Sequence, residues 1–228
     1  MGTDDRHKKR KARNTSRKRV EQKAVLIALE DTKSSKYYFD ALLKDKKLTG
    51  QVIFAKHIGT DPENVVEAIV KHELENPTKQ YEKRWAVIDK DDWSKKQING
   101  AINRAKDLGI CIAISNEAYE LWILLHFKPL SRYTHRTELN RELNRIFRER
   151  FGVDYSKSSQ EVYAFTVGLQ SEAIKNSKQL VAMHIRNNGS LNACENNPLS
   201  LVFELVECLN SLYNKNKKCS CFPIENNI

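Results

Sequence analysis

The chain has 228 residues, with 39 lysine and arginine side chains against 29 aspartate and glutamate side chains, which gives a net charge of +10. No run of 18 apolar residues occurs, so a transmembrane helix is not expected, and five cysteines without a CxxC pair favour the cytoplasm. The length suits one α/β domain with an added helical part, and the positive charge favours a polyanionic partner.

Much of the positive charge lies in residues 1–23, which hold ten basic and three acidic side chains. Because this segment lacks apolar periodicity, we expect residues 1–22 to form a flexible arm, and we expect a flexible tail over 215–228. The arm either binds the phosphates of nucleic acid or only keeps the protein in solution. If it binds nucleic acid, its contacting residues are Lys8, Lys9, Arg10, Lys11, Arg13, Arg17, Lys18 and Arg19.

Strands and helices alternate four times within residues 23–130. Apolar runs predict strands at 24–29, 51–58, 85–88 and 110–114. Helical spacing follows each run, in helices that begin near 36, 62, 94 and 118. This alternation predicts an α/β fold with a mostly parallel sheet of four strands, or slightly more, and helices on both faces.

Beyond residue 130 the pattern becomes helical. We expect helices at about 137–150, 162–180 and 199–213, with a polar loop over 151–161. Residues 131–214 are therefore interpreted as a helical accessory region packed on the core.

Carboxylates follow the predicted strands where they end. Glu30 ends the first strand, Asp89 and Asp91 follow the third, and Asn116 with either Glu117 or Glu120 follows the fourth. Parallel strands present these ends at one edge, and oxygen ligands suit Mg²⁺ or Mn²⁺. For Asp89 and Asp91 the alternative is a solvated acidic turn in which one aspartate caps the next helix, and for Glu30 it is a polar entry into a helix.

Two cations flank the third strand. Arg84 and Lys90 either contact a substrate phosphate or keep the neighbouring acids ionised. Trp122 and His126 lie among leucines on a predicted helix, so we interpret them as packed core residues rather than catalytic ones.

These features together resemble a known family. The apolar strand into Glu30, the Asp-Lys-Asp at 89–91 and the block Ser-Asn-Glu-Ala-Tyr-Glu-Leu-Trp-Ile-Leu-Leu-His-Phe at 115–127 resemble the RloB-like proteins over residues 10–210. That resemblance implies a TOPRIM-like catalytic core that uses one glutamate and an Asp-x-Asp pair with Mg²⁺. It also implies a role in anti-phage abortive infection, often beside an ATPase partner.

The resemblance assigns roles to four carboxylates. Glu30 matches the general acid/base or metal-side glutamate, Asp89 and Asp91 match the metal-binding pair, and Glu120 matches a recurrent acid that supports the site or binds a second metal. The chain departs from the family pattern in two turns: after Glu30 both the usual glycine, replaced by Asp31, and a second glutamate are absent, and after Asn116 Glu117 replaces a proline.

The main hypothesis is a metal-dependent nuclease that hydrolyses RNA or DNA in a defence system. A tyrosine nucleophile, as in topoisomerases, would require a further domain that we do not find. The alternative is a non-catalytic nucleic-acid-binding or regulatory subunit of a partner ATPase.

Overall fold

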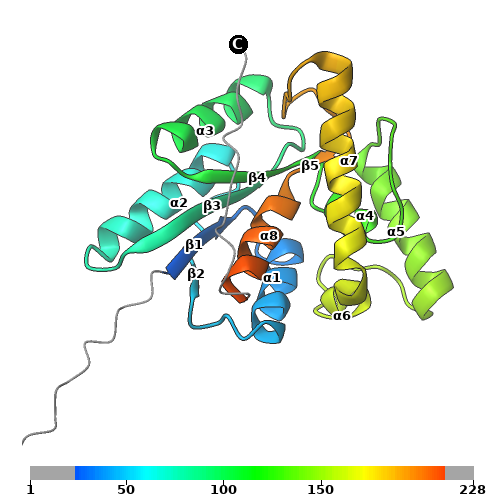
Figure 1. The fold of residues 1–228 in the computed structure, drawn as a ribbon, viewed down its shortest axis with the longest axis horizontal. Coiled ribbons are helices and arrows are strands. Elements are labelled where there is room, and N and C mark those ends of the chain that lie inside the picture. The colour runs from blue at the N-terminus through cyan, green and yellow to red at the C-terminus, as the bar shows by residue number, and fades with distance from the viewer. Residues whose placement is uncertain (1–23, 214–228) are drawn as a thin grey trace, which may run out of the picture.

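The computed structural model describes residues 24–213, and Figure 1 shows a sheet with helices around it. The first half contains β1 (Ala24–Leu29), α1 (Ser34–Asp45), β2 (Val52–Phe54), α2 (Pro62–Glu75), β3 (Tyr81–Asp89), α3 (Lys95–Asp107) and β4 (Cys111–Asn116). The second half contains α4 (Glu120–Leu125), α5 (Arg136–Phe151), α6 (Val162–Thr166), the 3₁₀ turn η1 (Val167–Leu169), α7 (Gln170–Asn188), β5 (Leu199–Ser200) and α8 (Val202–Tyr213). The basic residues predicted to bind nucleic acid, Lys8 to Arg19, and the predicted tail 215–228 lie outside the described residues.

The sheet has five strands in the order β2-β1-β3-β4-β5. β2, β1, β3 and β4 run parallel, and β5 pairs antiparallel with β4. The register places Leu29 beside Val87 and Asp89 beside Ser115, so β1, β3 and β4 end at the same edge. The predicted α/β fold with a mostly parallel sheet is therefore confirmed.

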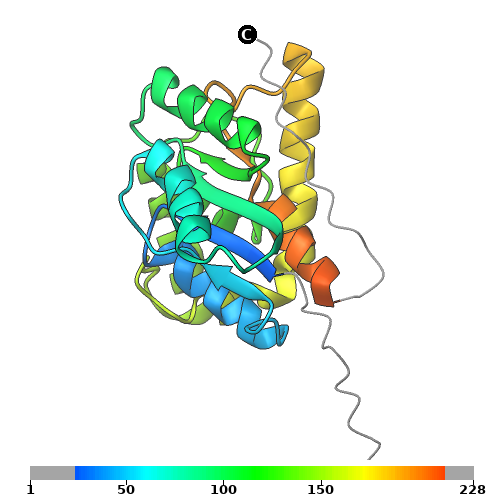
Figure 2. The ribbon, with the colours of Figure 1, turned by 90° about the vertical axis from the view of Figure 1, so that its left-hand side faces the viewer.

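Helices cover both faces of this sheet, as predicted. α2 and α3 pack on each other against one face, while α1 and α8 lie on the other (Figures 1 and 2). The sequence fixes where α2 and α3 begin: the Asp61 side chain accepts a hydrogen bond from the Glu63 amide at 2.9 Å, and Ser94 with Gln97 forms a capping box.

The second half is joined to the sheet as well as packed beside it. α4 packs against α5 and α7, and α7 also contacts β5 and α8. Residues 199–213 were predicted to be one helix, but Leu199 and Ser200 form β5 and the helix begins at Val202. The reason is that β4 needs backbone partners on its outer edge: Ser200 pairs with Ser115, and the Leu201 amide donates to the Ile114 carbonyl at 2.8 Å.

Other predicted boundaries differ for local reasons. The strand predicted at 51–58 is shorter, because β2 is an edge strand that pairs with β1 alone, and the strand predicted at 85–88 extends back to Tyr81. The helix predicted at 118–127 shrinks to α4, whose flanking turns are closed by three-residue hydrogen bonds such as Phe127 to Leu124. The helix predicted at 162–180 divides into α6, η1 and α7, with Gly168 in the break.

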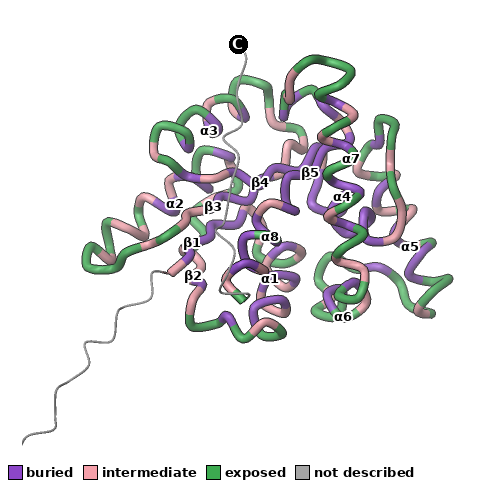
Figure 3. The backbone as a smooth tube through the Cα atoms, in the orientation of Figure 1, coloured by how far each residue is buried: buried purple, intermediate pink, exposed green. Residues whose placement is uncertain are grey.

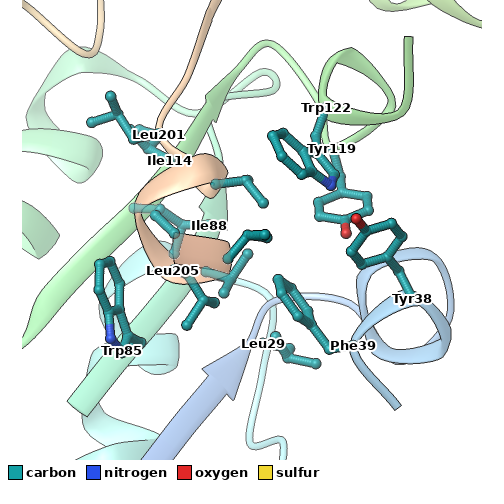
Figure 4. Packing of buried hydrophobic residues seen from close by; sticks show 14 of the residues in the cluster. Leu29, Tyr38, Phe39, Trp85, Ile88, Ile114, Tyr119, Trp122, Leu201 and Leu205 are labelled. Carbon is teal, nitrogen blue, oxygen red and sulfur yellow. The ribbon is translucent and has the colours of Figure 1, made fainter. Parts of the chain in front are cut away.

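The apolar strands and helix faces form one core, seen as the purple stretches of Figure 3. Figure 4 shows Tyr38 and Phe39 of α1 facing Tyr119 and Trp122 across the interior. Trp122 and His126 are both buried, which fits their interpretation as packed residues.

Two further observations concern the cysteines and the membrane. Cys111 and Cys208 are disulfide-bonded and Cys194 is free, whereas the cysteine pattern was interpreted as that of reduced thiols. Among the helices within 24–213, none has the length and apolar character that a bilayer span requires.

Candidate active site

The strand ends bring most of the predicted carboxylates to one place. Glu30 follows β1, and its amide donates to the Val87 carbonyl of β3 at 3.1 Å. A cavity of about 360 Å³ opens at this edge of the sheet. Its lining includes three of the four predicted carboxylates and comprises Glu30, Asp31, Thr32, Lys33, Ser34, His57, Thr60, Asp89, Asp91 and Lys157.

Glu30 links β1 to the loop that follows β3. One carboxylate oxygen accepts a hydrogen bond from the Asp89 amide at 2.6 Å, and the other accepts one from Trp93 Nε1 at 3.3 Å. Burial raises the pKa of Glu30 to about 7, and these two hydrogen bonds oppose that rise. Each carboxylate oxygen retains a lone pair beyond these bonds, so Glu30 can still bind a cation.

Asp89 ends β3 beside Glu30. Its pKa is raised well above the ordinary value, first by burial and then by the negative charges of Glu30 and Glu120. A hydrogen bond from the Tyr119 backbone opposes this rise. Asp89 is therefore repelled by both Glu30 and Glu120, and a cation beside Glu30 and Asp89 would relieve the repulsion between those two.

Glu120 is the most buried of the predicted carboxylates. It is 1% exposed at the start of α4, and the Tyr155 hydroxyl donates to it at 3.3 Å. Lys157 Nζ lies 3.1 Å from its other oxygen and also lines the cavity. Tyr155 and Lys157 come from the polar loop between α5 and α6, where nothing in the sequence marked them as site residues.

Asp91 lines the cavity, but its carboxylate is paired with an arginine of the same chain. Its backbone φ is 36°, in the left-handed region, and its amide donates to the Glu117 carbonyl at 2.8 Å. Its carboxylate accepts a hydrogen bond from Arg136 Nη1, while Arg136 Nη2 donates to Asp92 at 2.6 Å. Sequence reasoning missed Arg136, which begins α5 in the accessory region.

The two cations that flank β3 have different surroundings. Lys90 lies next to the acids and its Nζ donates to the Asp91 carbonyl at 3.2 Å. Arg84 instead donates to the Leu108 carbonyl at 2.9 Å and pairs with Glu73 of α2 at 3.3 Å. The expectation that Arg84 lies beside the acids was wrong, because it stands five residues before Asp89 and turns toward α2 and the end of α3.

The carboxylates at this edge of the sheet suit a cation that binds few protein ligands. Within residues 24–213, no group of three or more histidine, cysteine, aspartate or glutamate side chains is arranged around one metal position. Mg²⁺ often binds only one or two carboxylates and completes its shell with water and substrate phosphate. Glu30 and Asp89, which are mutually repelling and partly buried, fit that requirement as a pair.

Comparison with known proteins gives one match. Residues 25–209 match the family model described as RloB-like protein, a range that includes Glu30, Asp89, Asp91 and Glu120. No curated protein and no solved structure matches the chain. The suspected family resemblance is confirmed over this range.

Proposed function

The chain belongs to the RloB-like family, and from that membership and the pairing of Glu30 with Asp89 we propose that it is a divalent-metal-dependent nuclease. The observation that carries the proposal is the contact between the Glu30 carboxylate and the end of β3, which holds two acids together at the mouth of a cavity. Acids placed this way serve phosphodiester hydrolysis, where a cation must be held against a phosphate.

The residues would divide the work as follows. Glu30 and Asp89 would hold Mg²⁺ or Mn²⁺. A bound divalent cation lowers the pKa of water and neutralises charge on the phosphate. Where Glu30 does not bind the cation, its carboxylate would instead accept a proton from the attacking water. Lys33 and Lys157 line the same cavity; Lys33 would supply positive charge for the substrate phosphate, while Lys157 is paired with Glu120.

The biological role follows from family membership alone. We propose that the nuclease acts in an anti-phage system of the abortive-infection type, together with an ATPase partner and with RNA or DNA as substrate. The chemistry of the cavity does not depend on that setting, so the activity can be tested first on the isolated chain.

The test is cleavage of single- and double-stranded DNA, total RNA and tRNA in Mg²⁺, Mn²⁺ or EDTA. Asp89→Asn removes one charge with almost no change of shape. Asp107→Asn is the matched control, because Asp107 is the last residue of α3, just before the start of β4, and so lies away from the strand ends that carry the site. Cutting that requires metal, disappears in Asp89→Asn and persists in Asp107→Asn supports the proposal. Cutting that persists in EDTA or in Asp89→Asn contradicts it.

A non-catalytic nucleic-acid-binding or regulatory subunit is the second candidate. The observation in its favour is that Asp91, one of the expected metal ligands, is paired with Arg136. Nucleic-acid binding without cleavage, both alone and with the partner ATPase added, would favour this candidate over the nuclease.

A further inference from the structure

We propose that Arg136 competes with the metal for Asp91, so that cation binding displaces an internal ion pair. This inference rests on the proposed function, because it concerns the same site. It adds a regulatory residue from the accessory region, and it predicts that the metal affinity of the intact chain is lower than its carboxylates alone would give.

The ion pair is directional and shared between two acids. Arg136 Nη1 donates to Asp91 and Nη2 to Asp92, so one guanidinium occupies both acids that follow Lys90. The side chains of Arg136 and Asp91 are 35% and 39% exposed, which leaves the pair open to exchange with ions from solution. Since arginine keeps its charge at working pH, Asp91 always has a cation beside it in this arrangement.

Glu117 holds both partners of the pair in place. Its carbonyl accepts the Asp91 amide at 2.8 Å, and its carboxylate accepts the Arg136 amide at 3.0 Å. The Tyr133 hydroxyl also donates to this carboxylate at 2.8 Å. The start of α5 is thereby fixed against the loop after β3, and this places the Arg136 side chain beside Asp91.

Asp91 stands between two possible partners. It lines the cavity with Glu30 and Asp89, yet its carboxylate turns to Arg136. Its left-handed backbone conformation, with a φ of 36°, fixes the direction in which the side chain leaves the chain. A cation in the cavity that drew the Asp91 carboxylate away would release Arg136 Nη1 for a phosphate oxygen, while Nη2 would still donate to Asp92.

The experiment measures Mn²⁺ binding to the full chain by isothermal titration calorimetry, without substrate. Arg136→Gln should bind Mn²⁺ about fivefold more tightly, because a pair of this exposure contributes up to about 1 kcal/mol. Asp91→Asn should bind more weakly, and adding Arg136→Gln to Asp91→Asn should change nothing further. Arg141→Gln is the control for a general loss of positive charge, since Arg141 lies on the same helix and its side chain is 80% exposed.

The outcomes separate the two proposals. If no variant binds Mn²⁺, the metal site itself is wrong and this inference falls with it. If the wild type binds Mn²⁺ and Asp89→Asn does not, but Arg136→Gln matches the wild type or Arg141→Gln, only the competition is wrong. Thermal unfolding of each variant shows whether its fold is kept, and Glu117 can still accept the residue 136 amide in Arg136→Gln.

Discussion

His126 should make the protein lose stability in acid. The residue is 2% exposed, and its ring has Nδ1 2.9 Å from the Trp122 carbonyl oxygen and Nε2 3.3 Å from the Tyr38 hydroxyl oxygen. Burial lowers the pKa of His126 from 6.5 to about 4, because loss of water disfavours the charged ring. The folded protein therefore keeps this ring neutral at pH values where the unfolded chain protonates it.

The sign and size follow from the two pKa values. As the pH falls from 6.5 to about 4, the unfolded chain binds more protons than the folded one, so the free energy of unfolding decreases. The loss reaches about 2 kcal/mol at about pH 5 and about 3 kcal/mol below about pH 4. Losses of this size are a large part of the usual stability of a domain.

Urea unfolding of the wild type and His126→Asn over a pH series measures this loss. The variant should be less stable near neutral pH, because it loses the contact with Tyr38, but the difference should shrink by about 2 kcal/mol at about pH 5. Tyr38→Phe is the control: it removes the hydroxyl and keeps the titrating ring, so it should follow the pH dependence of the wild type. A difference between wild type and His126→Asn that stays constant with pH would refute the reasoning.

Three further predictions concern other charged groups. Burial raises the pKa of Glu204 to about 7, so the wild type should lose stability as the pH rises from 4.5 to about 7. In urea unfolding, Glu204→Gln should therefore be more stable than the wild type by about 1–3 kcal/mol at about pH 8, but not at about pH 4. Lys157→Met should cost about 1–2 kcal/mol in thermal unfolding by leaving the buried Glu120 without its cation, and adding Glu120→Gln should recover most of that loss. Asp61→Ala should cost about 1 kcal/mol through loss of the cap on α2, whereas Asp61→Asn should keep most of that stability; equal losses in both would contradict the capping role.

The sequence predicts the parts of the site that depend on strand ends. Glu30 and Asp89 were found because an apolar run that stops at an acid marks the edge of a parallel sheet, and the register of β1 with β3 confirms that they meet. Asp91 was found in the same way, but its direction was not, because that depends on a left-handed backbone and on a partner 45 positions later. Contacts of this kind leave no local pattern in the chain.

The remaining misses have the same origin. Lys157 reaches Glu120 from a polar loop whose composition is that of any solvated segment. Leu199 and Ser200 are too few to show strand periodicity, and their strand exists only because β4 offers a free edge. In each case the contact joins residues that are distant in the sequence, so local propensity does not reveal it.

The antiparallel pairing of β5 with β4 also has a consequence for how the chain is made. Ser115 and Ser200 stand 85 positions apart, so a ribosome has completed β4 long before its outer neighbour exists. Until then the nascent sheet presents unpaired backbone groups, which are a template for pairing with other chains. Translation that stalls before Leu199 should therefore yield products that aggregate or recruit chaperones, even though the strands carrying Glu30 and Asp89 are already complete.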